Sequence, residues 1–280
     1  MESLVTTDWL AKELGASDLR VVDATKFMGG TERNARAEYE AGHIPSAVFM
    51  DLGDLVDPSD PIENMAPKAE RFASRMQSLG LGDGSRIVLY DDSPLVSASR
   101  AWWLLKLFGA HDVALLDGGL AKWKAEGRPL EMGNHTLRHR HFTVWRDAKA
   151  VRTKDQVLAN VESKAEQLVD ARSAKRFTGE DRDPRPGMAP GHIPGSRSLP
   201  MSDLFNADGT WKQGDALLAA FAAAGIDPAR PMITTCGSGM TASALAFAAH
   251  LLGNEDVALY DGSWAEWGAD PTTPKATGAA

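Results

Sequence analysis

Short apolar runs alternate along the chain with longer amphipathic stretches. The runs lie at 21–24, 87–91, 168–171 and 231–235, and the stretches lie at 67–79, 97–108, 215–224 and 241–252. A run of four or five apolar residues is typical of a buried strand, and a longer stretch with one apolar face is typical of a helix. Strands that alternate with helices predict an α/β fold, in which a parallel β-sheet is flanked by helices on both faces.

The two halves of the chain repeat the same landmarks in the same order. Each half has a strand-like run ending in Asp-Ala, then Gly-His-Ile-Pro, then a second strand-like run, and then Asp-Gly followed by tryptophan. These landmarks begin at positions 21, 42, 87 and 117 in the first half and at 168, 191, 233 and 261 in the second. Such a repeat indicates an internal duplication, so the sequence predicts two similar α/β domains.

The only cysteine of the chain, Cys236, lies where the second half turns from a predicted strand into a predicted helix. The loop that it opens consists of Gly237, Ser238, Gly239, Met240 and Thr241. Two glycines let the backbone curl so that successive N–H groups point inward and favour an anion, and the helix adds its positive end. We therefore predict a reactive thiolate at Cys236, rather than the small buried hydrophobe that a lone cysteine often is.

Charge and composition exclude several classes of function. The net charge of −8 argues against general nucleic-acid binding, and no apolar stretch is long enough to span a membrane. The N-terminus lacks a basic region followed by an apolar core, so no secretory signal is predicted. A single cysteine excludes an internal disulfide and fits a reducing compartment, and a cytoplasmic location is the expectation.

The segment between the two halves is rich in histidine and arginine. Its histidines are His135, His139 and His141. Because their sequence neighbours are arginines rather than carboxylates or thiols, we interpret the segment as a solvated linker that packs across both domains, and expect neither a metal site nor a cofactor. The predicted organisation is a non-catalytic domain at 1–132, a linker at 133–152, a catalytic domain at 153–268 and a tail at 269–280. The composition of the tail, rich in Pro, Thr, Ala and Gly, predicts poor order.

Together these motifs resemble the two-domain rhodaneses. The resemblance rests on the tandem halves, the two Gly-His-Ile-Pro segments, the Cys-Gly-Ser-Gly-Met-Thr loop and the late Asp-Gly-Ser-Trp, and the loop is similar to that of the 3-mercaptopyruvate sulfurtransferase branch. It implies an enzyme that takes sulfur from 3-mercaptopyruvate, forms a persulfide on Cys236 and releases pyruvate. The persulfide would pass its sulfur to a thiol, thioredoxin or cyanide. Inward N–H groups of the loop suit such an anionic intermediate of covalent catalysis.

Two arginines are expected to bind the carboxylate of such a substrate. Arg176 and Arg185 follow the predicted strand that ends at Asp170, so they belong to the same carboxyl edge as Cys236. The resemblance implies that arginines nine residues apart in this segment hold the substrate. A guanidinium suits this task because it can donate to both carboxylate oxygens. From the residues alone, solvated loop charges are an equally open interpretation, since acidic residues lie between the two arginines.

The chain departs from this branch at positions that matter for proton transfer. Members often have a histidine just before a Met-x-Pro segment, where it pairs with the loop serine and with an aspartate; this chain has Asn64 and Gly53 at those positions. A serine–histidine–aspartate relay is therefore not expected, and Ser238 is assigned to binding. His43 and His192 occur at matched positions of both repeats and are expected to be structural.

Three other functions fit the motifs less well. A thiosulfate-preferring rhodanese would gain from cationic groups in the loop after Cys236, because thiosulfate is a dianion. A phosphatase of similar fold needs an arginine six residues after its cysteine, where this chain has Ala242. A non-enzymatic module that senses sulfur or docks partners would not need an anion-binding loop around a cysteine.

Overall fold

The computed structural model describes residues 1–135 and 137–279, which form two compact units. The first unit comprises Met1–Asp57, Ala66–Asp147 and Ala207–Trp211. The second comprises Pro58–Met65, Ala148–Asn206 and Lys212–Ala280. Among the described residues, no helix is both long enough and apolar enough to cross a membrane.

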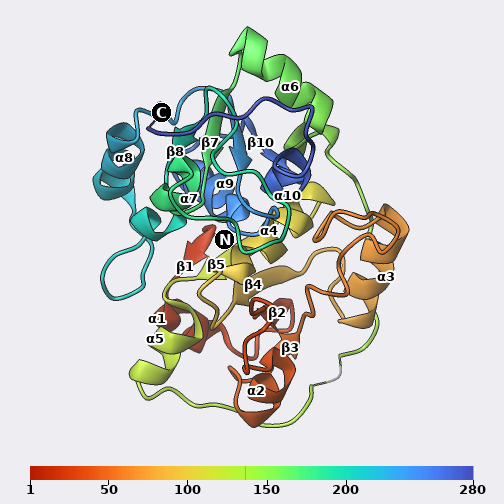
Figure 1. The fold of residues 1–280 in the computed structure, drawn as a ribbon. Coiled ribbons are helices and arrows are strands. Elements are labelled where there is room, and N and C mark those ends of the chain that lie inside the picture. The colour runs from red at the N-terminus through yellow and green to blue at the C-terminus, as the bar shows by residue number, and fades with distance from the viewer. Residues whose placement is uncertain (136, 280) are drawn as a thin grey trace. The chain divides into compact units, whose positions relative to one another are not determined.

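The first unit contains one sheet whose five strands are all parallel (Figure 1). Its strands are β1 (Leu4–Val5), β2 (Leu19–Asp23), β3 (Val48–Phe49), β4 (Arg86–Tyr90) and β5 (Val113–Leu116). Its helices are α1 (Thr7–Glu13), α2 (Ala35–Ala41), α3 (Ala69–Ser78), α4 (Ser97–Leu107) and α5 (Gly119–Ala125). The strands lie in the order β1-β5-β4-β2-β3, so β4 occupies the centre.

The second unit repeats this architecture (Figure 1). Its strands are β6 (Val151–Arg152), β7 (Gln167–Asp170), β8 (Arg197–Ser198), β9 (Met232–Thr235) and β10 (Val257–Tyr260). Its helices are α6 (Lys154–Ser163), α7 (Ala174–Thr178), α8 (Gly214–Ala223), α9 (Ala242–Leu251) and α10 (Ser263–Trp267), with short 3-10 turns η1 (Ala148–Ala150) and η2 (Met201–Leu204). The order β6-β10-β9-β7-β8 is all parallel and matches the first sheet strand for strand. The predicted duplicated α/β fold is confirmed.

The duplication extends to individual hydrogen bonds. Trp123 Nε1 donates to the carbonyl oxygen of Pro129 at 2.8 Å, and Trp267 Nε1 donates to that of Pro274 at 2.8 Å. Both indoles are fully buried. A buried indole needs an acceptor for its N–H, so the chain that leaves each sheet returns to supply one.

The core of the second unit positions the cysteine loop. Residues 242–249 of α9 are all buried, and most of them are alanine, so the helix packs closely on β9 and β10. Trp264, Trp267 and Leu168 lie in one apolar cluster. Burying each large apolar side chain stabilises the fold by about 1.5–3 kcal/mol. The turn from β9 into α9 is therefore held between two well-packed elements.

Most described residues of the segment between the two halves are exposed, and Phe142 and Thr143 attach it to the first unit: Phe142 is buried and the Thr143 hydroxyl donates to Asp83 at 2.7 Å. The expectation of a poorly ordered tail is wrong as far as Gly278, because Ala276 forms a β-bridge with His192 and the Gly278 N–H donates to Thr178 O. Composition could not predict this bridge, since it depends on a partner that is remote in sequence.

Candidate active site

Cys236 directly follows the last residue of β9, the central strand of the second sheet. Its side chain is buried, with 2% of the residue exposed. The loop 237–241 then leads into α9, which begins at Ala242. Central strands of parallel sheets carry ligand sites at their carboxyl ends, so the predicted position of the thiol at such an end agrees with the structure.

Ser263, the first residue of α10, holds the loop by hydrogen bonds to its backbone. The buried Ser263 Oγ accepts the N–H of Cys236 at 3.2 Å and the N–H of Gly239 at 3.1 Å, and donates to Tyr260 O at 2.9 Å. The N–H groups of Trp264 and Ala265 also donate to the carbonyls of Cys236 and Gly237. These contacts fix the loop from Cys236 to Gly239.

Fixing the carbonyl groups leaves several loop N–H groups unused. Over the described chain, four of them donate to no protein acceptor, namely those of Gly237, Ser238, Met240 and Thr241. The Thr241 side chain makes no capping hydrogen bond at the start of α9. Because backbone N–H groups are rarely left without an acceptor in a folded protein, this set is suited to an anion at the cysteine. Of the predicted loop residues, Gly239 differs, since its N–H is already bound to Ser263.

At the matched position of the first unit, the carboxyl group of Asp91 takes the place of the thiol. Asp91 follows the central strand β4 as Cys236 follows β9, and its carboxylate accepts the N–H groups of Ser93 at 2.9 Å and Ala98 at 2.6 Å. Its backbone carbonyl accepts the Leu120 N–H at 3.0 Å, as Cys236 O accepts that of Trp264. Burial raises the pKa of Asp91 to about 7, against the effect of these hydrogen bonds. The matched position in each repeat therefore faces N–H donors that stabilise negative charge.

Arg185, predicted to bind substrate, is largely engaged by the protein itself. Its Nε and Nη2 donate to the two carboxylate oxygens of Asp183 at 2.7 and 2.9 Å. Its Nη1 donates to Glu63 Oε1 at 2.8 Å and to Gly237 O at 2.6 Å. Burial alone would raise the pKa of Asp183, but the hydrogen bonds and charge of Arg185 hold that pKa below its usual value. Four of the five guanidinium N–H groups are thus committed, and Arg185 fixes the loop carbonyl at Gly237.

The contact of Arg185 with the loop also explains the glycine at position 237. A β-carbon on Gly237 would lie 2.9 Å from Arg185 Nη2. A larger residue here would therefore require the guanidinium of Arg185 to shift. Glycine is favoured at this position by the close approach of a neighbour rather than by an unusual backbone angle.

Arg176, the other predicted arginine, lies on α7 at the same edge and is differently placed. Its backbone N–H is capped by the Ser173 side chain at 3.4 Å. Its guanidinium makes no hydrogen bond or ion pair with any described residue, although its charge helps to lower the pKa of Asp183. Arg176 is therefore the arginine that is available to a substrate carboxylate.

The loop serine meets an amide where the family pattern would place an imidazole. Asn64 Nδ2 donates to Ser238 Oγ at 3.1 Å. Asn64 belongs to the segment Pro58–Met65, which packs with the second unit, and adopts a left-handed backbone with φ of 61°. Because the amide cannot take up a proton, it positions the hydroxyl without acting as a base.

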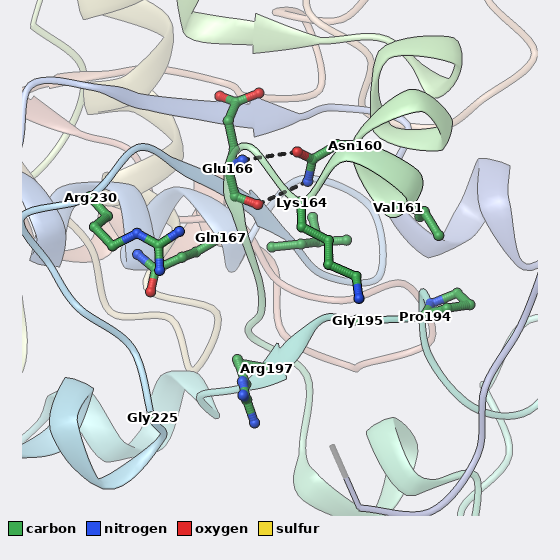
Figure 2. A pocket seen from close by; sticks show the side chains of 11 residues that line it. Asn160, Val161, Lys164, Glu166, Gln167, Pro194, Gly195, Arg197, Gly225 and Arg230 are labelled. Carbon is green, nitrogen blue, oxygen red and sulfur yellow. Dashed lines mark hydrogen bonds between the residues drawn. The ribbon is translucent and has the colours of Figure 1, made fainter.

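A cavity of about 240 Å³ in the second unit lies at the opposite edge of the sheet (Figure 2). Its lining includes Gln167 and Arg197, the first residues of β7 and β8, together with Lys164 and Arg230. Figure 2 shows Asn160 beside it, hydrogen-bonded to the backbone of Glu166. The cavity thus faces the amino ends of the strands and is separate from the Cys236 loop.

Comparison with known proteins agrees with this geometry. The sequence profile of the Rhodanese-like domain matches residues 6–126 and 153–270. The chain belongs to the rhodanese family. It is 40% identical over 272 residues to 3-mercaptopyruvate sulfurtransferase of Escherichia coli K12, which covers 96% of each protein. It is 38% identical over 271 residues to human 3-mercaptopyruvate sulfurtransferase, covering 95% of this chain and 91% of the human protein.

Other relatives carry a different name or a solved structure. Thiosulfate sulfurtransferase of Cricetulus griseus is 39% identical over 272 residues, covering 95% of this chain and 91% of that protein. The crystal structure of SseA, a 3-mercaptopyruvate sulfotransferase from Escherichia coli, matches with a TM-score of 0.86 at 37% identity, covering 94% of this chain and 99% of SseA. The rhodanese fold is therefore shared over nearly the whole chain.

Two residues of this rhodanese site were not predicted from the sequence. Ser263 stands in the Asp-Gly-Ser-Trp landmark, which gave a signal of repetition but none of function. Arg172 is also buried, pairs with Asp170 at 2.7 Å and lies 4.4 Å from the ring centre of Trp264. It connects the end of β7 to α10, the helix that holds the cysteine loop.

Proposed function

We propose that this rhodanese is a 3-mercaptopyruvate sulfurtransferase with Cys236 as its nucleophile. The thiolate attacks the sulfur of 3-mercaptopyruvate and a sulfur–sulfur bond forms while the carbon–sulfur bond breaks. The electron pair of that bond passes to the carbon of the pyruvate enolate, which then takes up a proton. The enzyme is left with a persulfide on Cys236.

The single observation that best supports this proposal is the set of unused loop N–H groups around Cys236. A persulfide at neutral pH carries its charge on the outer sulfur, about one bond length beyond the thiol. Fixed N–H donors stabilise such a charge without reorganisation, and Gly237, Ser238, Met240 and Thr241 provide them. Gly239 is assigned a structural role, because its N–H donates to Ser263 Oγ and helps to hold the loop in its curled conformation.

The carboxylate of 3-mercaptopyruvate is assigned to Arg176. This side chain has no protein partner among the described residues, whereas Arg185 is bound to Asp183, Glu63 and Gly237. Arg185 keeps one free N–H and its charge beside the loop, so its part in substrate binding is secondary to its part in holding the loop. Ser238 binds the substrate or the persulfide, and the enolate receives its proton from water, because Asn64 cannot supply one.

The rest of the chain serves this site. We propose that residues 1–132 form a non-catalytic rhodanese-like domain, since Asp91 stands where the nucleophile would be. Residues 133–152 connect it to the catalytic domain at 153–268, and 269–280 form the tail. A thiol, a thioredoxin-type protein or cyanide accepts the sulfur, in the cytoplasm, with no cofactor and without nucleic acid or membrane as a partner.

The test is a steady-state comparison of 3-mercaptopyruvate and thiosulfate with one acceptor, for the parent enzyme and for Arg176→Ala. We expect the parent to prefer 3-mercaptopyruvate. A charged hydrogen bond contributes about 1.5–3 kcal/mol, so Arg176→Ala should lower kcat/KM for 3-mercaptopyruvate roughly 10- to 150-fold, with a smaller effect on thiosulfate. Arg176→Lys should keep only part of the parent's kcat/KM for 3-mercaptopyruvate, because a point charge cannot bind both carboxylate oxygens.

Two results would contradict parts of this assignment. If the parent prefers thiosulfate, the enzyme is a thiosulfate sulfurtransferase, the name that the Cricetulus griseus relative bears. If Arg176→Ala reduces kcat/KM equally for both donors, the arginine supports the site without binding the substrate carboxylate. Arg182→Ala is the matched control, since Arg182 is an exposed arginine of the same segment.

A further inference from the structure

Three potential metal ligands from distant parts of the sequence meet in the first unit. His43, Glu131 and His135 each offer one ligand atom, and these atoms all lie within 4.8 Å of one another. No metal site was predicted from the sequence, because His135 has arginines as close neighbours. Glu131 stands four residues before His135 in the sequence, and the fold brings His43 from a distant part of the chain to both of them.

The buried member of this cluster, His43, has a nitrogen without a partner. Its Nδ1 lies 2.8 Å from the carbonyl oxygen of Tyr39. A carbonyl can only accept, so Nδ1 carries the proton and Nε2 holds a lone pair that is available as an acceptor or ligand. Among the described residues, no donor lies within hydrogen-bonding distance of this Nε2, although the residue is 0% exposed. A buried, unpaired ring nitrogen requires an explanation.

The other two members of the cluster, Glu131 and His135, already contact each other through their side chains. His135 Nε2 lies 2.8 Å from Glu131 Oε2, which also accepts the Ser46 N–H at 2.7 Å. The Ser46 N–H therefore holds Glu131 Oε2 in place beside the ring of His135. The side chains of His135 and Glu131 are 41% and 44% exposed, which leaves a path from solvent.

From this arrangement we propose that His43, Glu131 and His135 bind a divalent transition-metal cation of the zinc class. Two imidazoles and one carboxylate are a zinc-type ligand set, with water as the fourth ligand of a tetrahedral site. Ligand atoms around zinc lie roughly 3.3 Å apart, given bond lengths of about 2.0–2.2 Å. The exposed side chains of Glu131 and His135 need to move by about an ångström to reach this spacing. The Nδ1–H bond of His43 to Tyr39 O is the outer contact that typically orients a ligating histidine.

The second repeat supplies an internal comparison. His192 matches His43: its Nδ1 lies 2.8 Å from Phe177 O, and its ring stacks on that of Phe177 as His43 stacks on Tyr39. The β-bridge partner of His43 is Glu131, whereas that of His192 is Ala276. The repeat thus keeps the histidine and its support but lacks the carboxylate, so the site is specific to the first unit.

A metal here would join the Gly-His-Ile-Pro turn to the segment that leaves the first sheet. His43 follows α2, and Glu131 and His135 lie after α5. Metal binding would therefore stabilise the folded first unit. The three residues belong to the first unit, whereas the loop residues assigned to sulfur transfer belong to the second, so the proposal does not depend on that assignment.

The test is calorimetric titration of the full chain with Zn²⁺ in a Cys236→Ser background, which removes the thiolate as a competing ligand. We expect one equivalent of Zn²⁺ to bind. Glu131→Ala reproduces the second repeat and, like His135→Ala, should weaken binding by about 100-fold or more, beyond the 10- to 100-fold typical of outer-shell changes. His139→Ala, which removes an exposed histidine of the same segment, should leave the affinity unchanged.

Two further measurements keep the result decisive. Glu131→Gln retains an acceptor for the Ser46 N–H, so a loss of Zn²⁺ binding in this variant with an unchanged circular dichroism spectrum is a loss of the ligand rather than of the fold. Co²⁺ should give the visible absorption of a tetrahedral site in the parent and not in Glu131→Ala. The proposal is overturned if the Cys236→Ser chain binds no Zn²⁺, or if binding survives Glu131→Ala and His135→Ala.

Discussion

Replacing Arg185 by alanine removes the partner of a buried carboxylate beside the cysteine loop. The Asp183 side chain is 1% exposed and receives two hydrogen bonds from the guanidinium, which is itself 24% exposed. Removing one partner of a buried ion pair costs about 3–5 kcal/mol. Because solvent reaches the space that Arg185 leaves, we expect about 3 kcal/mol, the lower end of that range.

The pH dependence of this loss has a defined sign. In the parent, Arg185 lowers the pKa of Asp183, so the pair stabilises the fold fully above the unfolded pKa of about 3.9 and loses this effect as the pH falls through the folded pKa. In Arg185→Ala, burial without a partner raises the pKa of Asp183 and favours the neutral acid. The difference in unfolding free energy between the two proteins should therefore be large at pH 7 and smaller near pH 4.

The assay is urea denaturation of both proteins at the two pH values. Adding Asp183→Asn to Arg185→Ala should restore much of the lost free energy at pH 7, because the asparagine keeps an oxygen for the Arg185 backbone N–H without a buried charge. Arg182→Ala should have little effect. The account of Arg185 fails if its replacement costs the same at both pH values, or if Asp183→Asn gives no recovery.

Two other predictions concern the loop directly. Ser263→Ala removes the acceptor of the Cys236 and Gly239 N–H groups, and leaving each of these groups unpaired costs about 1–3 kcal/mol. The substitution should therefore lower the unfolding free energy by at least about 2 kcal/mol. The control is Ser196→Ala, which replaces a buried serine whose hydroxyl donates to Ile193 O. Ser238→Ala should lower turnover only roughly 5- to 150-fold, the effect of one lost hydrogen bond. A loss above about ten-thousand-fold would show that Ser238 transfers a proton.

Local patterns were sufficient to predict the fold because its strands and helices alternate regularly. The predicted helix at 97–108 is α4 with one residue fewer at its C-terminal end, and the predicted helix at 241–252 is α9 with one residue fewer at each end. The place of Cys236 after a strand also followed from adjacent residues. Each of these features depends on contacts that are close in sequence or on a period that the sequence displays.

Features that depend on distant partners could not be predicted in this way. Ser263 holds the loop through residues 27 and 24 positions away, and Arg185 reaches Gly237 across 52 positions and Glu63 across 122. Nothing in the pattern around Arg176 and Arg185 distinguishes a free guanidinium from an engaged one. The difference between the two arginines comes from tertiary contacts, as does the meeting of His43 with Glu131.

The measurement that tests the central claim most directly is the intact mass of the enzyme after incubation with 3-mercaptopyruvate and no acceptor. The account predicts an increase of one sulfur atom that a reducing thiol removes, together with the release of pyruvate. Cys236→Ser should show neither. A sulfur adduct that persists in Cys236→Ser, or pyruvate release that continues in it, would contradict the assignment of Cys236 as the residue that carries the transferred sulfur.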